Sequence, residues 1–209
     1  MIRKTKVLKI LLFSLLILSA CPLRGAMTAT GIMDKVVSAL NSAPSLNFKM
    51  NIQSGSNGSF TAYLTMSREK FKYELRGMTV FFDGTTQWTV DKDSKEVSIT
   101  EPTADELAET NPLAFVNNYK KNYKVSYVSE SNGTYTVKLT ALKKASYVRS
   151  AQVVVSGTTW LPTHITAKLS SGQDITILVT TATKGQTLPS SQFKYDKTQT
   201  PDFEMIDLR

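Results

Sequence analysis

The sequence has 209 residues, a formal net charge of +8 at pH 7, one cysteine and one histidine. Four of the basic residues lie before position 10, and without them 21 basic and 17 acidic residues remain, a net charge of +4. The later lysines and arginines form no run interleaved with aromatic residues, so we expect no nucleic-acid-binding surface. A single cysteine excludes a disulfide within the chain, and the fold must therefore be stabilised by its hydrophobic core.

The N-terminal segment has the composition of a secretory signal. Four basic residues and no acidic residue precede or adjoin an apolar run from Ile10 to Leu18, which is too short for a comfortable membrane span. We expect residues 1–26 to be a signal peptide and residues 27–209 to form a single domain.

A candidate lipidation site follows the apolar run. Leu18-Ser19-Ala20-Cys21 has the form of a lipobox, in which cleavage of the signal leaves an N-terminal cysteine that is acylated. Two acyl signals on Cys21 would anchor the protein stably to a membrane. Ordinary cleavage nearby, which discards Cys21 or leaves it as a free thiol, is the alternative.

Helical periodicity comes first and is followed by a long series of strands. Apolar residues between positions 29 and 40 form one stripe, with Thr28 or Thr30 as a possible N-cap, and Pro44 ends this amphipathic helix. From Asn47 onward apolar and polar residues alternate in short runs separated by turn residues, which indicates about eleven antiparallel strands. Because flat sheets of this size curl or split, we expect a mainly β fold with one highly curved sheet, an unclosed half-barrel.

Asp83-Gly84 predicts a β-hairpin, because alternating apolar runs flank it on both sides. A type I turn closed by Gly84 would place four apolar side chains on one face of the sheet: Met78, Val80, Trp88 and Val90. A two-residue loop would instead place Phe81 on the face of Trp88 and Val90. The sequence favours the first register and leaves the second open.

The period then changes from two to about 3.6. Thr103 and Glu106 have the spacing of a capping box ahead of Leu107, and Asn111-Pro112 is typical of the start of a second helix. The apolar residues of this second helix are Leu113, Phe115, Val116 and Tyr119. Two short amphipathic helices inserted in a sheet have to cover a sheet face, which predicts an α-helical lid.

Three segments carry a resemblance to a known family. They are FDGTTQWTVD at 82–91, EVSI at 96–99 and NPL at 111–113. Their order and spacing are similar to the pattern of the periplasmic outer-membrane lipoprotein carriers, the LolA-like family: D-G-x-x-x-W-x-Y-D, a polar turn, Q-V, and N-P or T-P before a helix. The segment 188–207 also resembles the end of that family, and the likeness extends roughly from Ala29 to Arg209.

The resemblance implies an exported, periplasmic protein that binds the acyl chains of lipoproteins in an apolar cavity and carries them to the outer membrane. It also implies an inner-membrane lipoprotein-releasing transporter as the loading partner. We expect a monomer without cofactor or metal. Two alternatives remain: a membrane-anchored acceptor of lipoproteins, tethered through Cys21, and an exported structural module whose concave face is filled by a solid core.

The expected acyl-chain site consists of apolar residues on the concave sheet face and on the lid. Methionines on this face suit variable acyl chains because their side chains are flexible. The candidate residues are Phe60, Leu64, Met66, Phe71, Tyr73, Met78, Val80, Trp88, Val90, Leu107, Leu113, Phe115, Val116 and Tyr119.

Catalysis is not expected. The single histidine, His164, lies in an expected strand beside Pro162, and the sequence contains no metal-ligand cluster, Gly-rich phosphate loop or nucleophile elbow. The composition therefore favours a binding protein over an enzyme.

Overall fold

The computed structural model describes residues 27–55, 58–103, 106–107 and 112–209. The expected signal peptide, Cys21 and the possible cap Asn111 lie outside these residues. None of the helices in the described part of the chain is long and apolar enough to cross a membrane.

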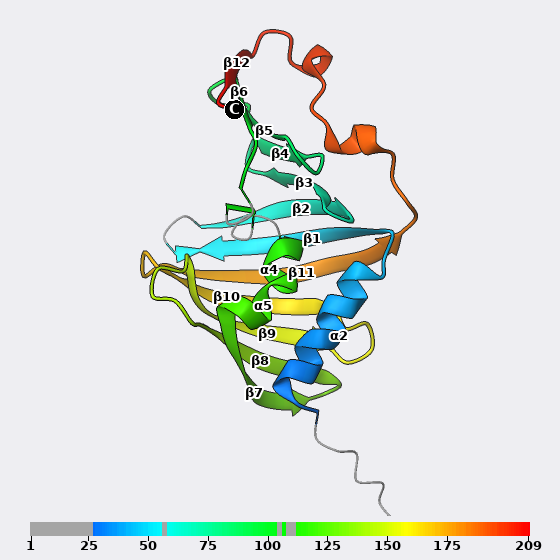
Figure 1. Ribbon diagram of the computed structural model, residues 1–209, viewed down its shortest axis with the longest axis vertical. Coiled ribbons are helices and arrows are strands. Elements are labelled where there is room, and N and C mark those ends of the chain that lie inside the picture. The colour runs from blue at the N-terminus through cyan, green and yellow to red at the C-terminus, as the bar shows by residue number, and fades with distance from the viewer. Residues whose placement is uncertain (1–26, 56–57, 104–105, 108–111) are drawn as a thin grey trace, which may run out of the picture.

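Twelve strands of the described chain form one sheet, accompanied by short helices (Figure 1). In chain order the elements are α2 (Ala29–Asn41), β1 (Ser45–Ser54), β2 (Ser59–Ser67), β3 (Lys70–Leu75), β4 (Met78–Phe82), β5 (Gln87–Asp91), β6 (Glu96–Thr100), α4 (Pro112–Asn117), α5 (Tyr119–Asn122), β7 (Tyr123–Ser131), β8 (Thr134–Ala141), β9 (Val148–Ser156), β10 (Pro162–Leu169), β11 (Asp174–Gly185), the 3-10 helices η2 (Ser190–Phe193) and η3 (Lys197–Gln199), and β12 (Glu204–Asp207).

The strand order is β12-β6-β5-β4-β3-β2-β1-β11-β10-β9-β8-β7. The two edge strands, β12 and β7, do not pair, so the sheet is not closed, which confirms the predicted unclosed half-barrel. Among the described strands, every pair is antiparallel except β12 with β6, which is parallel. About eleven strands were expected, and β12 is the additional one. The helices α2, α4 and α5 lie over one half of the sheet (Figure 1). This half contains the consecutive strands β1, β11, β10, β9, β8 and β7.

The predicted helix starts are largely confirmed. The Thr28 side chain accepts a hydrogen bond from Gly31 N–H at 3.0 Å and caps α2. In the capping box, Thr103 N–H donates to Glu106 Oε2 at 2.7 Å, and Glu106 N–H donates to Thr103 Oγ1 at 3.4 Å. The second expected helix is not continuous, because Asn118 leaves helical geometry (φ −98°, ψ 7°) and separates α4 from α5.

The prediction that Trp88 and Val90 share a sheet face with Met78 and Val80 is wrong. Phe81 pairs with Trp88 across β4 and β5, as the two-residue loop predicts. The Asp83 carboxylate accepts the N–H groups of Thr85 and Thr86 at 3.1 and 3.0 Å, and Asp83 N–H donates to Thr86 O at 3.2 Å. These bonds close the loop around Gly84 and Thr85 and fix that register, so Trp88 and Val90 lie on the opposite face from Val80.

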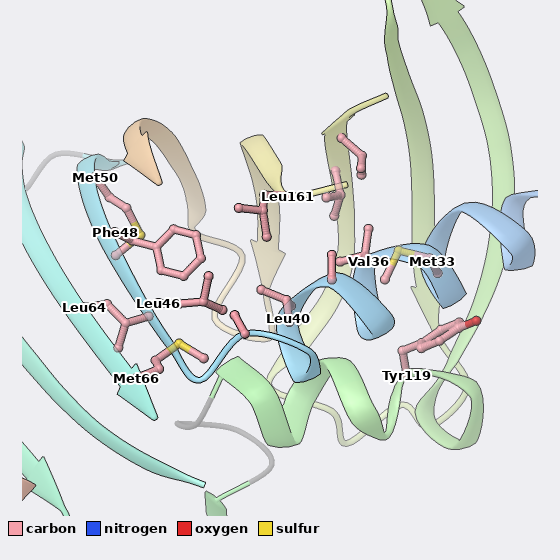
Figure 2. Close-up of a cluster of buried hydrophobic side chains, with 14 of the residues drawn as sticks. Met33, Val36, Leu40, Leu46, Phe48, Met50, Leu64, Met66, Tyr119 and Leu161 are labelled. Carbon is pink, nitrogen blue, oxygen red and sulfur yellow. The ribbon is translucent and has the colours of Figure 1, made fainter. Parts of the chain in front are cut away.

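The two faces of the sheet have separate apolar groups. The inner face, defined here as the face that carries Phe48, Leu64 and Phe71, packs against α2 in the main core (Figure 2). On the outer face, Val90, Val97 and Ile99 are buried but do not belong to the main core. Contacts from the C-terminal segment 186–203 reach this outer face: the Phe81 and Tyr195 rings are 6.5 Å apart, and Lys194 Nζ lies 3.4 Å from Asp83 Oδ2.

Candidate ligand-binding site

Antiparallel pairing brings most of the predicted strand residues together on the inner face. Cross-strand partners share a face, and the register pairs Leu64 with Tyr73, Met66 with Phe71, and Tyr73 with Val80. Leu64, Met66 and Phe71 are buried in the main core, and three more predicted residues are partly buried against it: Phe60, Tyr73 and Val80.

Four predicted residues do not join this group. Met78 shares the inner face with Val80 but is 37% exposed and lies outside the main core. Trp88 and Val90 belong to the outer face, as the hairpin register requires. The side chain of Leu113 lies outside the part of the chain that the structure describes.

Strand β1 and helix α2 supply inner-face residues that were not among the candidates. In Figure 2, side chains of α2 point toward those of β1 and β2, with Leu40 near Leu46. Their apolar stripes were visible in the sequence, but their position beside β2 depends on tertiary structure. The additional buried residues are Ile32, Met33, Val36, Leu40, Leu46, Phe48, Met50 and Ile52.

The predicted lid residues of the described chain pack on the main core. Leu107, Phe115 and Val116 are partly buried against it, and Tyr119 is only 2% exposed. The Phe115 ring also lies 5.1 Å from the ring of Tyr123, the first residue of β7. The lid therefore covers part of the inner face with aromatic and aliphatic side chains.

A polar cluster joins α5 to α2; we call Asp34, Tyr119 and Lys120 the helix clamp. Tyr119 Oη donates to Asp34 Oδ1 at 2.8 Å and is 3.2 Å from Thr30 O, and Lys120 Nζ lies 2.7 Å from Asp34 Oδ1. Hydrogen bonds from Lys120 and Tyr119 lower the pKa of Asp34. Burial and the neighbouring Asp34 carboxylate raise the pKa of Tyr119, so at neutral pH the phenol stays protonated and donates.

A second contact links α2 with α4. Asn41 Nδ2 donates to Asn117 Oδ1 at 2.8 Å, and both side chains are exposed. Hydrogen bonds at exposed positions exchange with water at little net cost. The lid is thus attached to α2 by apolar packing and by a few polar contacts near the surface.

Comparison with known families places the chain. The sequence matches the family described as "Outer membrane lipoprotein carrier protein LolA" over residues 19–173. The chain belongs to this family. The match confirms the resemblance seen in the sequence, and the search of curated proteins finds no significant match.

Three solved structures illustrate what this LolA family chain is similar to. An uncharacterized conserved protein from Thermus thermophilus is 12% identical, with a TM-score of 0.59 over 86% of this chain and 98% of the other. A LolA superfamily protein from Nitrosomonas europaea is 15% identical, with a TM-score of 0.42 over 82% and 99% of the two chains. The Pseudomonas aeruginosa MucA/MucB complex contains a chain that is 12% identical, with a TM-score of 0.44 over 80% and 61%. At these identities the likeness to the Thermus protein concerns the fold alone.

The chemistry available inside this LolA family fold is that of apolar burial. The buried polar side chains of the described residues are Ser45 and Ser67, and each hydroxyl donates to a backbone carbonyl, Gln186 O at 2.7 Å and Pro44 O at 2.9 Å. In the same part of the chain no three His, Cys, Asp or Glu side chains come together as metal ligands. The inner face is therefore suited to hold apolar groups.

Proposed function

We propose that the protein binds the acyl chains of lipoproteins between the inner sheet face and the lid, and carries them across the periplasm to the outer membrane. The observation that carries the proposal is an apolar inner face on β1 to β3 that belongs to one core with α2, whose polar contacts to α4 and α5 are exposed. The description of the matched family supports the cargo.

Apolar burial supplies enough free energy for such binding. Each buried methylene contributes about 0.8 kcal/mol, so an acyl segment of roughly ten carbons would contribute on the order of 8 kcal/mol before ordering costs are subtracted. A carrier has to release its cargo, so incomplete burial of the chains is compatible with the proposed function.

Opening of the lid is the proposed mechanism. The chains would replace Leu107, Phe115, Val116 and Tyr119 on the inner face as α4 and α5 move away from α2. Exposed ion pairs such as Lys120 with Asp34 contribute about 0–1 kcal/mol. The clamp thus gives the closed state a modest preference that cargo binding can overcome. An inner-membrane lipoprotein-releasing transporter would supply the cargo.

Displacement of an environment-sensitive hydrophobic dye tests the proposed function. Purified protein is loaded with the dye and titrated with a triacylated lipopeptide or with the same peptide without acyl chains. We expect saturable displacement by the lipopeptide alone. A folded protein, shown by a cooperative thermal transition, that takes up no dye would instead support the solid-core structural module.

Cross-linking the two helices tests the proposed opening. Asn41→Cys and Asn117→Cys, in a Cys21→Ser background, place two thiols at contacting positions of α2 and α4. After treatment with a short bis-maleimide, we expect slower dye uptake than after treatment with N-ethylmaleimide, which blocks both thiols without joining them. Equal uptake rates would contradict opening between these helices.

The lipobox supports a second candidate, a membrane-anchored acceptor of lipoproteins. Labelled palmitate incorporated into the protein, and lost in Cys21→Ser, would favour this candidate over a soluble carrier. Absence of label would favour the soluble carrier.

A further inference from the structure

A pocket of about 520 Å³ lies beside the main core, between α2, the turn that joins β9 to β10, and the end of β11. We call it the β9–β10 pocket. The residues that line it include two lysines, Lys35 and Lys184, and three hydroxyl-bearing residues, Ser38, Thr158 and Thr159. Among the described residues, no acidic side chain lines it.

The turn that forms one wall is held by its own hydrogen bonds. Ser156 Oγ accepts the N–H groups of Thr158 and Thr159 at 3.3 and 3.2 Å, and Trp160 N–H donates to Ser156 O at 2.9 Å. Trp160 has a φ of 59°, a left-handed conformation that is unusual for a bulky side chain. Such strain persists where the surroundings impose it, and it is common at ligand sites.

Trp160 presents an aromatic surface to the pocket. One ring contact is with Tyr135, stacked at 5.4 Å with an interplanar angle of 12°. Lys35 Nζ lies 4.6 Å from the centroid of the Trp160 ring, within the range of a cation–π interaction. This contact holds the Lys35 ammonium group at the pocket.

The charge of the pocket is not neutralised by the protein. Neither Lys35 nor Lys184 forms a salt bridge with any residue of the described chain. Two ammonium groups and three hydroxyls are donors that suit a phosphate group. The composition of the walls therefore indicates an anionic ligand.

The floor of the pocket is apolar and continuous with the main core. Ala39 and Leu161 line the pocket and are also buried members of the core, and Ala182 packs against it. Figure 2 shows Leu161 close to the side chains of α2. A ligand bound here would have its charged group at the lysines and its apolar part directed toward Ala39 and Leu161.

We infer that the β9–β10 pocket binds the phosphate of a lipid headgroup whose acyl chain continues onto the apolar floor. This inference rests on the proposed function, since it assigns a headgroup position to an acyl-chain-binding protein. It extends the ligand class from acylated proteins to phospholipids with a negative headgroup.

Binding of matched single-chain lipids tests the inference. A Trp88→Phe background leaves Trp160 as the single tryptophan, so its fluorescence reports on the pocket. The protein is titrated below micelle formation with lysophosphatidylglycerol, with a monoacylglycerol of the same chain length, and with glycerol phosphate. We expect the phospholipid to bind more tightly than the monoacylglycerol, and glycerol phosphate to bind weakly.

Lysine variants test whether the preference for phospholipid depends on the two lysines of the β9–β10 pocket. Lys35→Gln and Lys184→Gln should each weaken phospholipid binding about fivefold, the worth of one exposed ionic contact, and leave monoacylglycerol binding unchanged. Lys144→Gln removes the same charge in the loop between β8 and β9, away from the β9–β10 turn, and should change neither affinity.

Three results would overturn the inference. Equal affinities for phospholipid and monoacylglycerol would contradict a headgroup site in this pocket. The proposed binding of acyl chains would not be affected by that result. Glycerol phosphate binding as tightly as the phospholipid would indicate a site for free phosphate esters. Binding of no lipid at all by the folded protein would overturn the proposed function together with the inference.

Discussion

At the scale of single residues, Tyr119 connects the core with the lid surface. Its ring is buried, and its hydroxyl reaches Asp34 on α2 and the carbonyl of Thr30. A phenol suits this position because one end packs in the core while the other bonds to a charged surface group.

Tyr119→Phe should therefore loosen the lid without opening a hole in the core. Loss of the hydroxyl bonds is expected to lower the free energy of unfolding by about 1 kcal/mol and to speed dye uptake. Urea titration and stopped-flow fluorescence measure the two effects. Tyr195→Phe is the control, because its hydroxyl bonds to Thr200 in the C-terminal segment and should affect stability alone.

The helix clamp also makes lid opening depend on pH. Hydrogen bonds from Lys120 and Tyr119 lower the pKa of Asp34 below its ordinary value of 3.8. The ionised Asp34 carboxylate therefore stabilises the closed lid above pH 3.8. This stabilisation is lost as the pH falls through the lower pKa that Asp34 has in the folded protein. Dye uptake by the wild type should speed up below about pH 4, whereas Asp34→Asn should take up dye rapidly at every pH. If dye uptake by Asp34→Asn still became faster at low pH, as in the wild type, another carboxylate would be responsible for the pH dependence.

At the scale of elements, the β9–β10 turn depends on one close backbone approach. Gly157 N–H donates to Gly133 O at 2.8 Å, and a Cβ on Gly157 would lie 2.7 Å from that oxygen and 3.1 Å from Tyr135 Cε2. Any larger residue would push apart the turn that carries Trp160.

Gly157→Ala should lower the free energy of unfolding by about 1–3 kcal/mol, the usual cost of overpacking, and weaken phospholipid binding in the β9–β10 pocket. Gly172→Ala provides the comparison. A Cβ there has open space but a φ of 86°, so we expect a loss of about 1 kcal/mol and unchanged lipid affinity. Chemical denaturation and Trp160 fluorescence measure both variants.

At the scale of the whole molecule, the sheet separates two apolar groups with different roles. The inner face is the proposed ligand surface, and the outer face of β5 and β6 is buried near the C-terminal segment. Phe193 in η2 is fully buried and does not belong to the main core. Shortening a buried side chain should therefore lower stability on either side of the sheet, but it should alter ligand binding only on the inner face.

Phe193→Ala should lower the free energy of unfolding by about 3–5 kcal/mol and leave lipopeptide affinity unchanged in the protein that remains folded. Leu64→Ala, on the inner face, should cost about 2–5 kcal/mol and also alter lipopeptide affinity. Affinities are compared at a temperature where both variants are folded. Equal effects on binding would contradict the separation of the two sides.

Elements whose signals are local could be predicted from the sequence. The Thr28 cap, the Thr103–Glu106 capping box and the hairpin at Asp83-Gly84 could all be predicted, because each depends on residues within a few positions. The number of strands predicted the unclosed half-barrel, and the change to helical periodicity predicted its lid. Six of the nine predicted strand residues consequently do belong to the inner-face core or pack against it.

Which surfaces meet depends on long-range pairing and could not be predicted from the sequence. Strand β1 pairs with β11, more than a hundred positions away, and this pairing places α2 and Leu161 at the same core. Trp88 and Val90 changed face because a register shift by one residue, set by hydrogen bonds to Asp83, reverses every side chain in a strand. The Asp34–Tyr119 bond and the β9–β10 pocket could not be predicted, because long-range contacts depend on how the curved sheet folds the chain back on itself.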